Sequence, residues 1–256
     1  MNAHPHMIDH RLLSLTKTAD ILLNQHIINK TIQYDNFQAF YQQSQHQTPT
    51  QTRGRLRPPE RQIRGYLVKN IELKTIDIIF IGTKTIRDLK HDLKFKKEMI
   101  NLPSRFSSNQ LISSGKVHSG FYKLTNECRL ELNTLLNQSY YLNLEVPYSL
   151  RISGHSLGAA MAVFYCLLNN FKNITVTLFC TPKLGNNEFN RYFKSYCQDH
   201  AIQLQIIKNH YDFITWLPPI FFGYRSLRGD SPSQTNCCTR TLHCNPHSIR
   251  HLLDDF

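Results

Sequence analysis

A pentapeptide of the type Gly-x-Ser-x-Gly is the feature of this sequence best suited to chemistry. It runs Gly154-His155-Ser156-Leu157-Gly158, after an apolar run that predicts a strand and before alanines that predict a helix. On such a turn a serine has strained backbone angles, and its hydroxyl projects at the carboxyl edge of a sheet. The flanking glycines avoid collisions with the neighbouring strand and helix. The pattern predicts a nucleophile at Ser156; the alternative is a serine that only caps the helix.

A serine hydroxyl is a good nucleophile at neutral pH only when an imidazole accepts its proton and a carboxylate holds that imidazole. The carboxylate that fits best is Asp212, which lies just after the strand predicted at 204–208. A loop at that carboxyl edge could hold it near the serine. Asp199 and Asp230 are the rivals, and neither follows a clear strand end. A turn-forming role is the alternative for Asp212.

Three histidines near the C-terminus are candidates for the base: His243, His247 and His251. They are spaced by four residues, so one face of a helix could carry two of them. The chain has 13 histidines, so their position alone leaves the choice among the three open. The chain order serine, aspartate, histidine suits an α/β-hydrolase.

The oxyanion formed during attack on an ester needs hydrogen-bond donors. One is expected to be the backbone N–H of Leu157, the residue after the nucleophile. The second is expected from Thr83, which follows Gly82 at the end of the β-branched run 76–81. A simple strand-ending turn is the alternative interpretation of Gly82-Thr83.

The elements that would position these residues alternate along the chain. Strands are predicted at 76–81, 148–152, 174–180 and 204–208, and helices at 121–136, from the serine turn to 168, and at 189–196. This alternation favours one α/β domain with a mostly parallel sheet over residues 64–256. The domain is expected to open with a hairpin of 66–68 and 71–73. Residues 1–63 are expected to form an extension, with one or two amphipathic helices in 1–43 and then a polar loop.

Four further motifs accompany the serine pentapeptide in a fixed order. They are Ile81-Gly82-Thr83 followed by Asp88 and Asp92, Val117-His118-Ser119-Gly120-Phe121, Thr181-Pro182-Lys183-Leu184-Gly185-Asn186, and Asn209-His210-Tyr211-Asp212 followed by Leu217-Pro218-Pro219. With Ser153–Ala162 they resemble the class 3 (fungal-type) lipase family over about residues 64–252. The resemblance implies an α/β-hydrolase fold and cleavage of acylglycerol-type lipid esters through an acyl-enzyme, with no metal ion and no organic cofactor. The build is also similar to that of lipase-like proteins of large DNA viruses.

The resemblance assigns roles to single residues as well. It implies that His247 is the base, because His247-Ser248-Ile249 before Leu252-Leu253 resembles the last catalytic segment of the family. It implies that Asp92 orients the Thr83 hydroxyl and that an amphipathic lid over the acyl site lies within 83–118. A helix that covers the core is the alternative to the lid. Departures from the family are Ile81 in place of arginine, Leu89 in place of tryptophan and Phe213-Ile214 in place of Pro-Val.

An excess of basic residues distinguishes the composition. Lys and Arg number 30 against 18 Asp and Glu, a formal charge of +12. This surplus favours anionic partners, but no nucleic-acid-binding motif accompanies it, so nucleic acid is not an expected partner. The remaining interpretations are a well-solvated basic surface and peripheral contact with an anionic membrane or lipid-droplet surface, where a lipid ester substrate would lie.

The sequence also bears on location. No apolar stretch reaches the roughly 18–20 residues that span a bilayer, and the first residues lack the basic-then-apolar pattern of a secretory signal. Seven cysteines cannot all pair within one molecule. Cys166, Cys180 and Cys197 fall in predicted helices or strands, where a buried thiol acts as a small hydrophobe. These features predict a reducing, cytoplasmic location.

A cluster of cysteines and histidines near the C-terminus supports a second class of function. The cluster comprises Cys237, Cys238, His243, Cys244 and His247. Such side chains can hold zinc, and His247 bound to a metal ion could not act as a base. The chain would then be an inactive hydrolase fold that serves as a binding or scaffold protein. The spacing matches no zinc-finger pattern, which favours the hydrolase.

Overall fold

A computed structural model describes most of the central part of the chain and little near its two ends. The described residues are 37–41, 51–52, 55–56, 62–70, 74–82, 95–103, 111–139, 148–209, 212–227 and 236–237.

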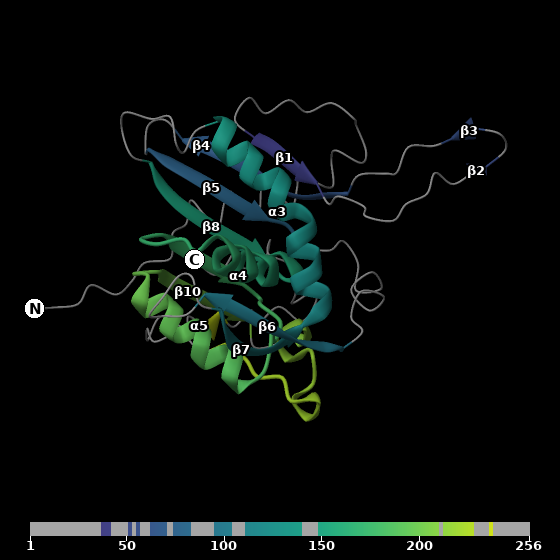
Figure 1. Cartoon of the computed structure of the whole chain (residues 1–256), viewed down its shortest axis with the longest axis vertical. Helices are drawn as coiled ribbons and strands as arrows, with labels where there is room; N and C mark the ends of the chain where they lie inside the picture. Colours follow the sequence, from purple (N-terminus) through teal and green to yellow (C-terminus); the bar gives the residue numbers. More distant parts are fainter. Residues whose placement is uncertain are drawn as a thin grey trace, which may run out of the picture.

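A seven-stranded sheet forms the centre of the molecule (Figure 1). In spatial order its strands are β1 (Phe37–Tyr41), β4 (Ile63–Asn70), β5 (Thr75–Phe80), β8 (Ser149–His155), β9 (Thr175–Phe179), β10 (Gln203–Asn209) and β11 (Asn236–Cys237). The pairs β1–β4 and β4–β5 are antiparallel, whereas the strands from β5 to β11 run parallel. The prediction of an α/β fold with a mostly parallel sheet is confirmed.

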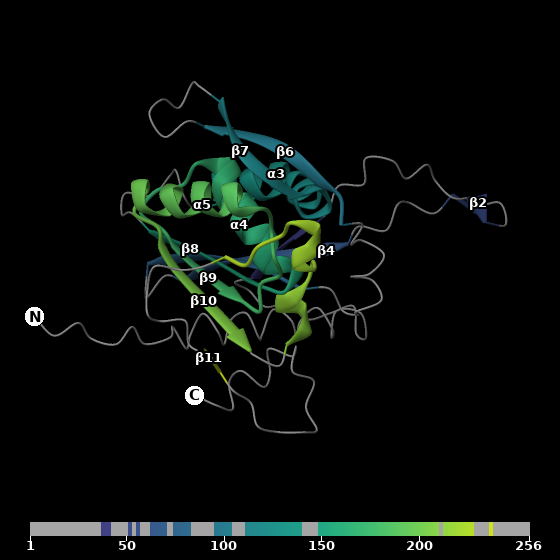
Figure 2. The same ribbon diagram turned by 90° about the horizontal axis from the view of Figure 1, so that it is seen from below.

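The helices α3 (Ser119–Ser139), α4 (Leu157–Asn169) and α5 (Asn187–Asp199) lie on one side of this sheet (Figure 2). The middle one, α4, contacts β5, β8 and β9. Every residue from Leu157 to Leu167 is buried, which is why this helix is apolar on all sides. All three helices occur where the sequence predicts them.

The strand that ends beside the serine turn is buried on both faces. Every residue of β5 is buried, as its run of β-branched residues requires. At its end the Phe80 ring packs edge-on against Phe40, with centroids 5.1 Å apart, and tilted against Tyr165 at 5.5 Å. Aromatic packing from β1 and α4 therefore fixes the end of β5.

A buried ion pair joins β5 to β8. Arg151 Nε lies 2.5 Å from Asp77 Oδ1, and the two residues face each other in the strand register. The Thr75 hydroxyl donates a hydrogen bond to the other oxygen of Asp77 at 3.3 Å. Because a shift in register would leave a buried charge without its partner, this pair favours one alignment of the two strands. Those strands lead to Gly82 and Ser156.

The helical prediction for residues 1–43 is wrong for Phe37–Tyr41. These residues form β1, which pairs antiparallel with β4 at the edge of the main sheet. Phe40 is completely buried against Phe80. The unpaired edge of β4 provides backbone partners and a core for Phe40, and this long-range pairing overrides the helical spacing. The rest of the predicted helices lies outside the described residues.

The prediction that residues 66–68 form a hairpin with 71–73 is also wrong. The β4 strand pairs antiparallel with β5, so that Leu67 faces Ile78, and the turn between the strands includes Lys74 with φ of 50°. The longer and more apolar β5 gives β4 a better partner than 71–73 because it is itself held in the sheet by β8. Within the expected polar loop, Gln51–Thr52 and Arg55–Leu56 form a short hairpin, β2–β3.

Part of the segment expected to carry the lid is a second hairpin. The strands β6 (Lys97–Pro103) and β7 (Leu111–His118) pair antiparallel, and β7 contacts α5. Ile100 and Leu102 are buried while Met99 is exposed, a period of two that fits a strand. A helix is therefore excluded for Lys97–Pro103, and the lid within 83–118 stays a prediction, because residues 83–94 and 104–110 lie outside the described residues.

The four cysteines described in the core are not joined by disulfide bonds. Cys166, Cys180 and Cys197 are buried, as predicted, and Cys128 on α3 joins them. Burial raises the pKa of the Cys128 thiol to about 12, so this side chain stays protonated at neutral pH. Among the described residues, no helix is both long enough and apolar enough to span a membrane.

Candidate active site

The backbone at Ser156 has the strained conformation expected of a nucleophile elbow. The strand β8 ends at His155 and α4 begins at Leu157, so a single residue turns the chain. Ser156 has φ of 57° and ψ of −120°, a region that residues other than glycine rarely occupy. The surrounding hydrogen bonds hold it there: its N–H donates to the Phe179 carbonyl at 2.9 Å, and its carbonyl accepts from Ala159 at 3.1 Å.

The two glycines of the pentapeptide are required by close backbone contacts. A Cβ atom at Gly154 would lie 2.3 Å from the Gly158 carbonyl oxygen, and one at Gly158 would lie 2.3 Å from the Phe80 carbonyl oxygen. Both distances are far below van der Waals contact. The collisions expected with the adjacent helix and strand are therefore present.

The serine side chain does not cap the helix. Ser156 occupies the N-cap position of α4 but makes no side-chain hydrogen bond to the helix. Its side chain is 1% exposed, so a substrate can reach the hydroxyl only when the residues that cover it move. The geometry thus argues against the helix-capping alternative, and the nucleophilic role stays a prediction.

The first turn of α4 and the end of β5 meet at the serine. Leu157 is the first residue of α4, where backbone N–H groups have no partner within the helix. A Cβ atom built on Gly82 would lie 3.4 Å from the Ser156 Cβ and 3.2 Å from His155 Nδ1. The predicted oxyanion loop therefore begins in contact with the elbow. Thr83 and Asp92, the other residues assigned to it, lie outside the described residues.

Asp212 lies at the same edge of the sheet as Ser156. It follows β10, which runs parallel to β8 and β9, and it is completely buried. Its carboxylate accepts a hydrogen bond from the Ile214 N–H at 2.9 Å, and its carbonyl accepts one from the Thr215 hydroxyl at 2.8 Å. These bonds start the short helix η1 (Phe213–Trp216). The rival Asp199 is exposed at the end of α5, and Asp230 lies outside the described residues.

The candidate bases lie outside the described residues. This applies to His243, His247 and His251, so the choice among them remains a prediction. The C-terminal cysteine and histidine cluster is equally untested, because only the backbone strand at Cys237 is described there. Elsewhere in the described part of the chain, no group of three or more His, Cys, Asp or Glu side chains is arranged to hold a metal ion.

His118 is a buried histidine at the end of β7. Its Nδ1 accepts a hydrogen bond from the Phe121 N–H at 3.4 Å, and its ring stacks on the Phe121 ring at 4.0 Å. Burial lowers the pKa of this imidazole to about 4, so the ring is neutral at pH 7. This explains the histidine in the Val117–Phe121 motif as a structural residue that joins β7 to α3.

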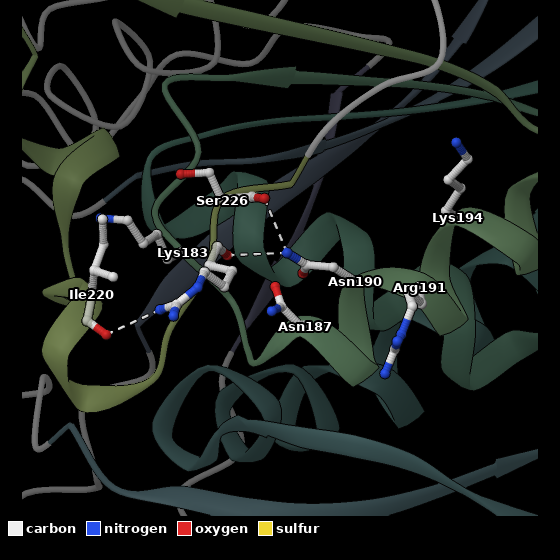
Figure 3. A pocket seen from close by; sticks show the side chains of 8 residues that line it. Lys183, Asn187, Asn190, Arg191, Lys194, Ile220 and Ser226 are labelled. Atoms are coloured by element: carbon white, nitrogen blue, oxygen red, sulfur yellow. Dashed lines mark hydrogen bonds between the residues drawn. The ribbon is translucent and has the colours of Figure 1, made fainter.

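The main feature that sequence reasoning missed is a basic pocket beside η1. It has a volume of about 640 Å³ and is lined by Lys183, Asn187, Asn190, Arg191, Lys194, Ile220, Arg225 and Ser226 (Figure 3). Lys183 is 4% exposed, and its Nζ donates a hydrogen bond to the Trp216 carbonyl. Burial, together with nearby Lys208 and Arg225, lowers the pKa of Lys183 to about 8. The sequence contains no signal for this pocket, because its cations come from separate segments.

A parallel α/β sheet with a strained serine between strand and helix defines the α/β-hydrolase class. The class 3 lipase family model matches residues 78–222, so the chain belongs to the class 3 lipase family. It is 29% identical to a lipase of Rhizomucor miehei over 184 residues, 66% of this chain and 46% of that protein. It is 30% identical to a chloroplastic phospholipase A(1) of Arabidopsis thaliana over 172 residues, 62% of this chain and 37% of that protein.

The same relationship is visible in the fold. The lipase of Rhizomucor miehei in its propeptide complex matches with a TM-score of 0.56, covering 87% of this chain and 67% of that chain at 22% identity. This likeness supports the fold alone. The chain spans less than half the length of the curated relatives named here and about two fifths of the Rhizopus niveus lipase (39%), so its activity is argued from its own residues.

Proposed function

We propose that this protein is a serine-dependent carboxylic ester hydrolase that acts on acylglycerol-type lipids through an acyl-enzyme. The observation that carries the proposal is the backbone of Ser156, whose φ of 57° and ψ of −120° are retained without any capping bond from the side chain. Strain of this kind persists only where the surrounding structure enforces it, and it is concentrated at functional sites.

The proposed reaction begins with attack of the Ser156 hydroxyl on the ester carbonyl. His247 accepts the hydroxyl proton, and Asp212 holds the imidazole and stabilises its positive charge. The protonated imidazole then gives its proton to the leaving alcohol, and the acyl-enzyme remains. Water activated by the same histidine attacks the acyl group, which leaves as a carboxylic acid and regenerates the serine.

The oxyanion of each tetrahedral intermediate is proposed to receive hydrogen bonds from the backbone N–H groups of Leu157 and Thr83. The position of Leu157 at the start of α4 supports this role, because the helix dipole favours negative charge there. The closeness of Gly82 to Ser156 supports a contribution from the next residue, Thr83. Asp92 is proposed to orient the Thr83 hydroxyl. None of these steps requires a metal ion or an organic cofactor.

The burial of Ser156 fits an enzyme whose site opens at a lipid surface. At 1% exposure the side chain is closed to a bulky ester. We propose that residues 83–94 carry the lid and move away at an interface, where the apolar side of the lid can contact lipid. One relative is described as a lipase and another as a phospholipase A(1), which supports a lipid ester substrate for this chain and leaves the head group to experiment.

The experiment that tests the function is a substrate profile of the purified chain. Short- and long-chain p-nitrophenyl esters, triolein and phosphatidylcholine are each assayed with the native chain and with Ser156→Ala. The proposal predicts turnover that disappears in the variant and rises with long-chain lipid substrates. Turnover that survives in Ser156→Ala would rule out Ser156 as the nucleophile. Turnover limited to short esters would show that the protein is an esterase and not a lipase.

A second experiment identifies the base. His243→Ala, His247→Ala and His251→Ala are compared by their kcat on a short soluble ester. Only His247→Ala is expected to lose turnover to the extent that Ser156→Ala does, because groups that act as one unit have non-additive effects. A zinc analysis of the same preparations tests the alternative function: stoichiometric zinc that is lost in Cys237→Ser, with no ester turnover in the native chain, favours the scaffold protein.

A further inference from the structure

A row of exposed apolar side chains begins immediately after Asp212. These residues, called here the aromatic ridge, are Phe213, Trp216, Ile220, Phe221 and Phe222, with exposed fractions of 40%, 67%, 57%, 81% and 44%. They lie on η1 and on a second short helix, η2 (Ile220–Phe222). Five large apolar side chains are thus exposed within ten residues, and groups of exposed apolar side chains on soluble domains mark interaction sites.

The side chains and backbone of the ridge are held in place by defined contacts. The rings of Phe221 and Phe222 are 4.4 Å apart, and Phe222 also packs on Phe95 at 5.3 Å. The turn after η2 closes through Gly223, whose N–H donates to the Ile220 carbonyl at 2.8 Å. The aromatic side chains are therefore held on the surface by their own contacts, and exposing them costs hydrophobic free energy that a purely structural element would avoid.

The basic pocket adjoins the ridge through its own cations. Arg225 Nη1 donates to the Ile220 carbonyl at 3.1 Å, and Lys183 Nζ donates to the Trp216 carbonyl. Ile220 belongs to both the ridge and the pocket, and Figure 3 shows it across the pocket from the α5 residues Asn190 and Arg191. The pocket and the ridge thus form one continuous surface.

The charge of this surface is one-sided. Four cations line the pocket: Lys183, Arg191, Lys194 and Arg225. The described residues that line it include no carboxylate, and the partners of Lys183 and Arg225 given above are backbone carbonyls, which carry no net charge. The pocket therefore has the chemistry to receive a phosphate group.

We propose that the aromatic ridge and the basic pocket together form a docking site for an anionic phospholipid surface. The ridge enters the interfacial layer, and the pocket receives the phosphate of a lipid head group. Tryptophan and phenylalanine flanked by lysine and arginine match the chemistry of that layer, in which aromatic rings lie at head-group depth and each cation gains from the negative surface potential. The formal charge of +12 acts in the same direction at long range.

This inference rests on the proposed function and deepens it. The ridge starts one residue after Asp212, so a lipid surface that receives the ridge would lie beside the edge of the sheet that carries Ser156. Docking there would bring an acyl ester to the site without diffusion through water.

The test uses the full chain with Ser156→Ala and vesicles of ether-linked lipids, which contain no ester to cleave. One vesicle consists of ether-linked phosphatidylcholine, and the other also contains ether-linked phosphatidic acid. Trp216 is the only tryptophan in the chain, so a blue shift of its emission directly reports its entry into the lipid layer. Flotation of the vesicles gives the partition coefficient. Strong partition with a blue shift on the anionic vesicle is expected, and equal or absent binding to both vesicles overturns the proposal.

Two variants and two matched controls locate the site. Phe221→Ser is expected to lower the partition coefficient roughly tenfold or more, the effect of losing one buried aromatic side chain. Arg191→Gln with Lys194→Gln is expected to lower it roughly fivefold for each charge removed. The controls on α3, Leu130→Ser and Lys123→Gln, remove an exposed leucine and an exposed lysine that belong to neither the ridge nor the lining of the pocket, and they are expected to have no effect. Loss of binding in the controls equal to that in the site variants overturns the proposal.

The same experiments distinguish two other possible ligands of this surface. Inorganic phosphate that binds the pocket saturably while the chain ignores anionic vesicles indicates a soluble phosphate ligand and overturns lipid docking. A dimer that Phe221→Ser dissociates, with no vesicle binding, indicates a second copy of the chain and does the same. Turnover of a soluble ester by the native chain is measured separately, so vesicle binding without turnover rejects the hydrolase while the docking site stands.

Discussion

The serine turn and the aromatic ridge are held in opposite ways, although the ridge begins directly after Asp212, the residue proposed to complete the triad of Ser156. Asp212 is completely buried, and Phe221, nine residues further along, is 81% exposed. The serine turn is held by the backbone, through strained angles at Ser156 and glycines that admit no side chain. The ridge is held by side chains, with Arg225 and Lys183 bonded to its carbonyls.

The difference follows from what each region has to do. A nucleophile and its partners must keep their geometry out of water, where hydrogen bonds and charges act strongly. A docking surface must instead present apolar and charged groups to its partner before contact. We therefore expect substitutions at the serine turn to change turnover or folding. Substitutions on the ridge are expected to leave both stability and core packing unchanged.

The largest effect is expected at the nucleophile. Ser156→Ala should lower kcat on a soluble ester by on the order of 10⁶-fold, because the triad acts as one unit. The unfolding temperature should stay close to that of the native chain. Ser149→Ala, an exposed serine at the start of the same strand, is the matched control and should leave kcat unchanged. A small effect of Ser156→Ala would show that the strained turn has another purpose.

The next effect concerns the carboxylate. Asp212→Asn should lower kcat by on the order of 10⁴-fold, because an amide cannot stabilise the imidazolium. The fold should survive, since asparagine can still accept the Ile214 N–H at the start of η1. Asp199→Asn is the control, and kcat should not change there. The reverse result, with Asp199 essential, would move the catalytic site away from the end of β10.

A third prediction concerns the glycines. Gly158→Ala should lower the free energy of unfolding by about 3 kcal/mol or more, because its Cβ would lie 2.3 Å from a β5 carbonyl that cannot move alone. Gly82→Ala, whose Cβ would meet its nearest atoms at 3.2 Å, should cost about 1 kcal/mol. Urea unfolding of the two variants gives both values. Equal losses would mean that the turn is less tightly held than its backbone indicates.

A fourth prediction concerns pH and the buried His118. Its pKa is about 4 in the folded chain and 6.5 when exposed, so below pH 6.5 the unfolded chain binds a proton that the folded chain does not. Stability from this group is complete above pH 6.5 and falls by roughly 3 kcal/mol as the pH drops to about 4. His118→Asn keeps an acceptor for Phe121 and should flatten that slope in urea titrations at several pH values. His200→Asn, at a partly exposed ring, should leave most of the slope in place.

The smallest effect is expected on the ridge. Phe221→Ser should change the free energy of unfolding by no more than about 0.5 kcal/mol, because the ring is 81% exposed. Phe80→Ala, at a completely buried ring, should cost about 3–5 kcal/mol. Thermal unfolding of the two variants makes the contrast. A large loss in Phe221→Ser would assign the ridge to the core and weaken its interpretation as a docking surface.

The parts of the fold that the sequence predicted are those decided by local patterns. The helix α4 is apolar on all sides, which predicts a buried helix, and the glycines around Ser156 predict a tight turn within five residues. The strand Phe37–Tyr41 was missed because its partner, β4, lies more than twenty residues away. The residues of Phe37–Tyr41 alone do not reveal that the edge of β4 is available to pair with them.

Composition and local spacing alone determined the serine turn, the alternation of strands and helices, and the order of the candidate triad. Each depends on contacts between residues close in the chain, where side-chain size and backbone freedom decide the outcome. Only the tertiary structure decided that Lys183, Arg191 and Arg225 share one pocket and that the aromatic side chains beside them face solvent. Those residues come from segments that are far apart in the chain and are brought together where Asn190 of α5 donates to the carbonyls of Arg225 and Ser226. Charge has no period along a sequence from which such a contact could be predicted.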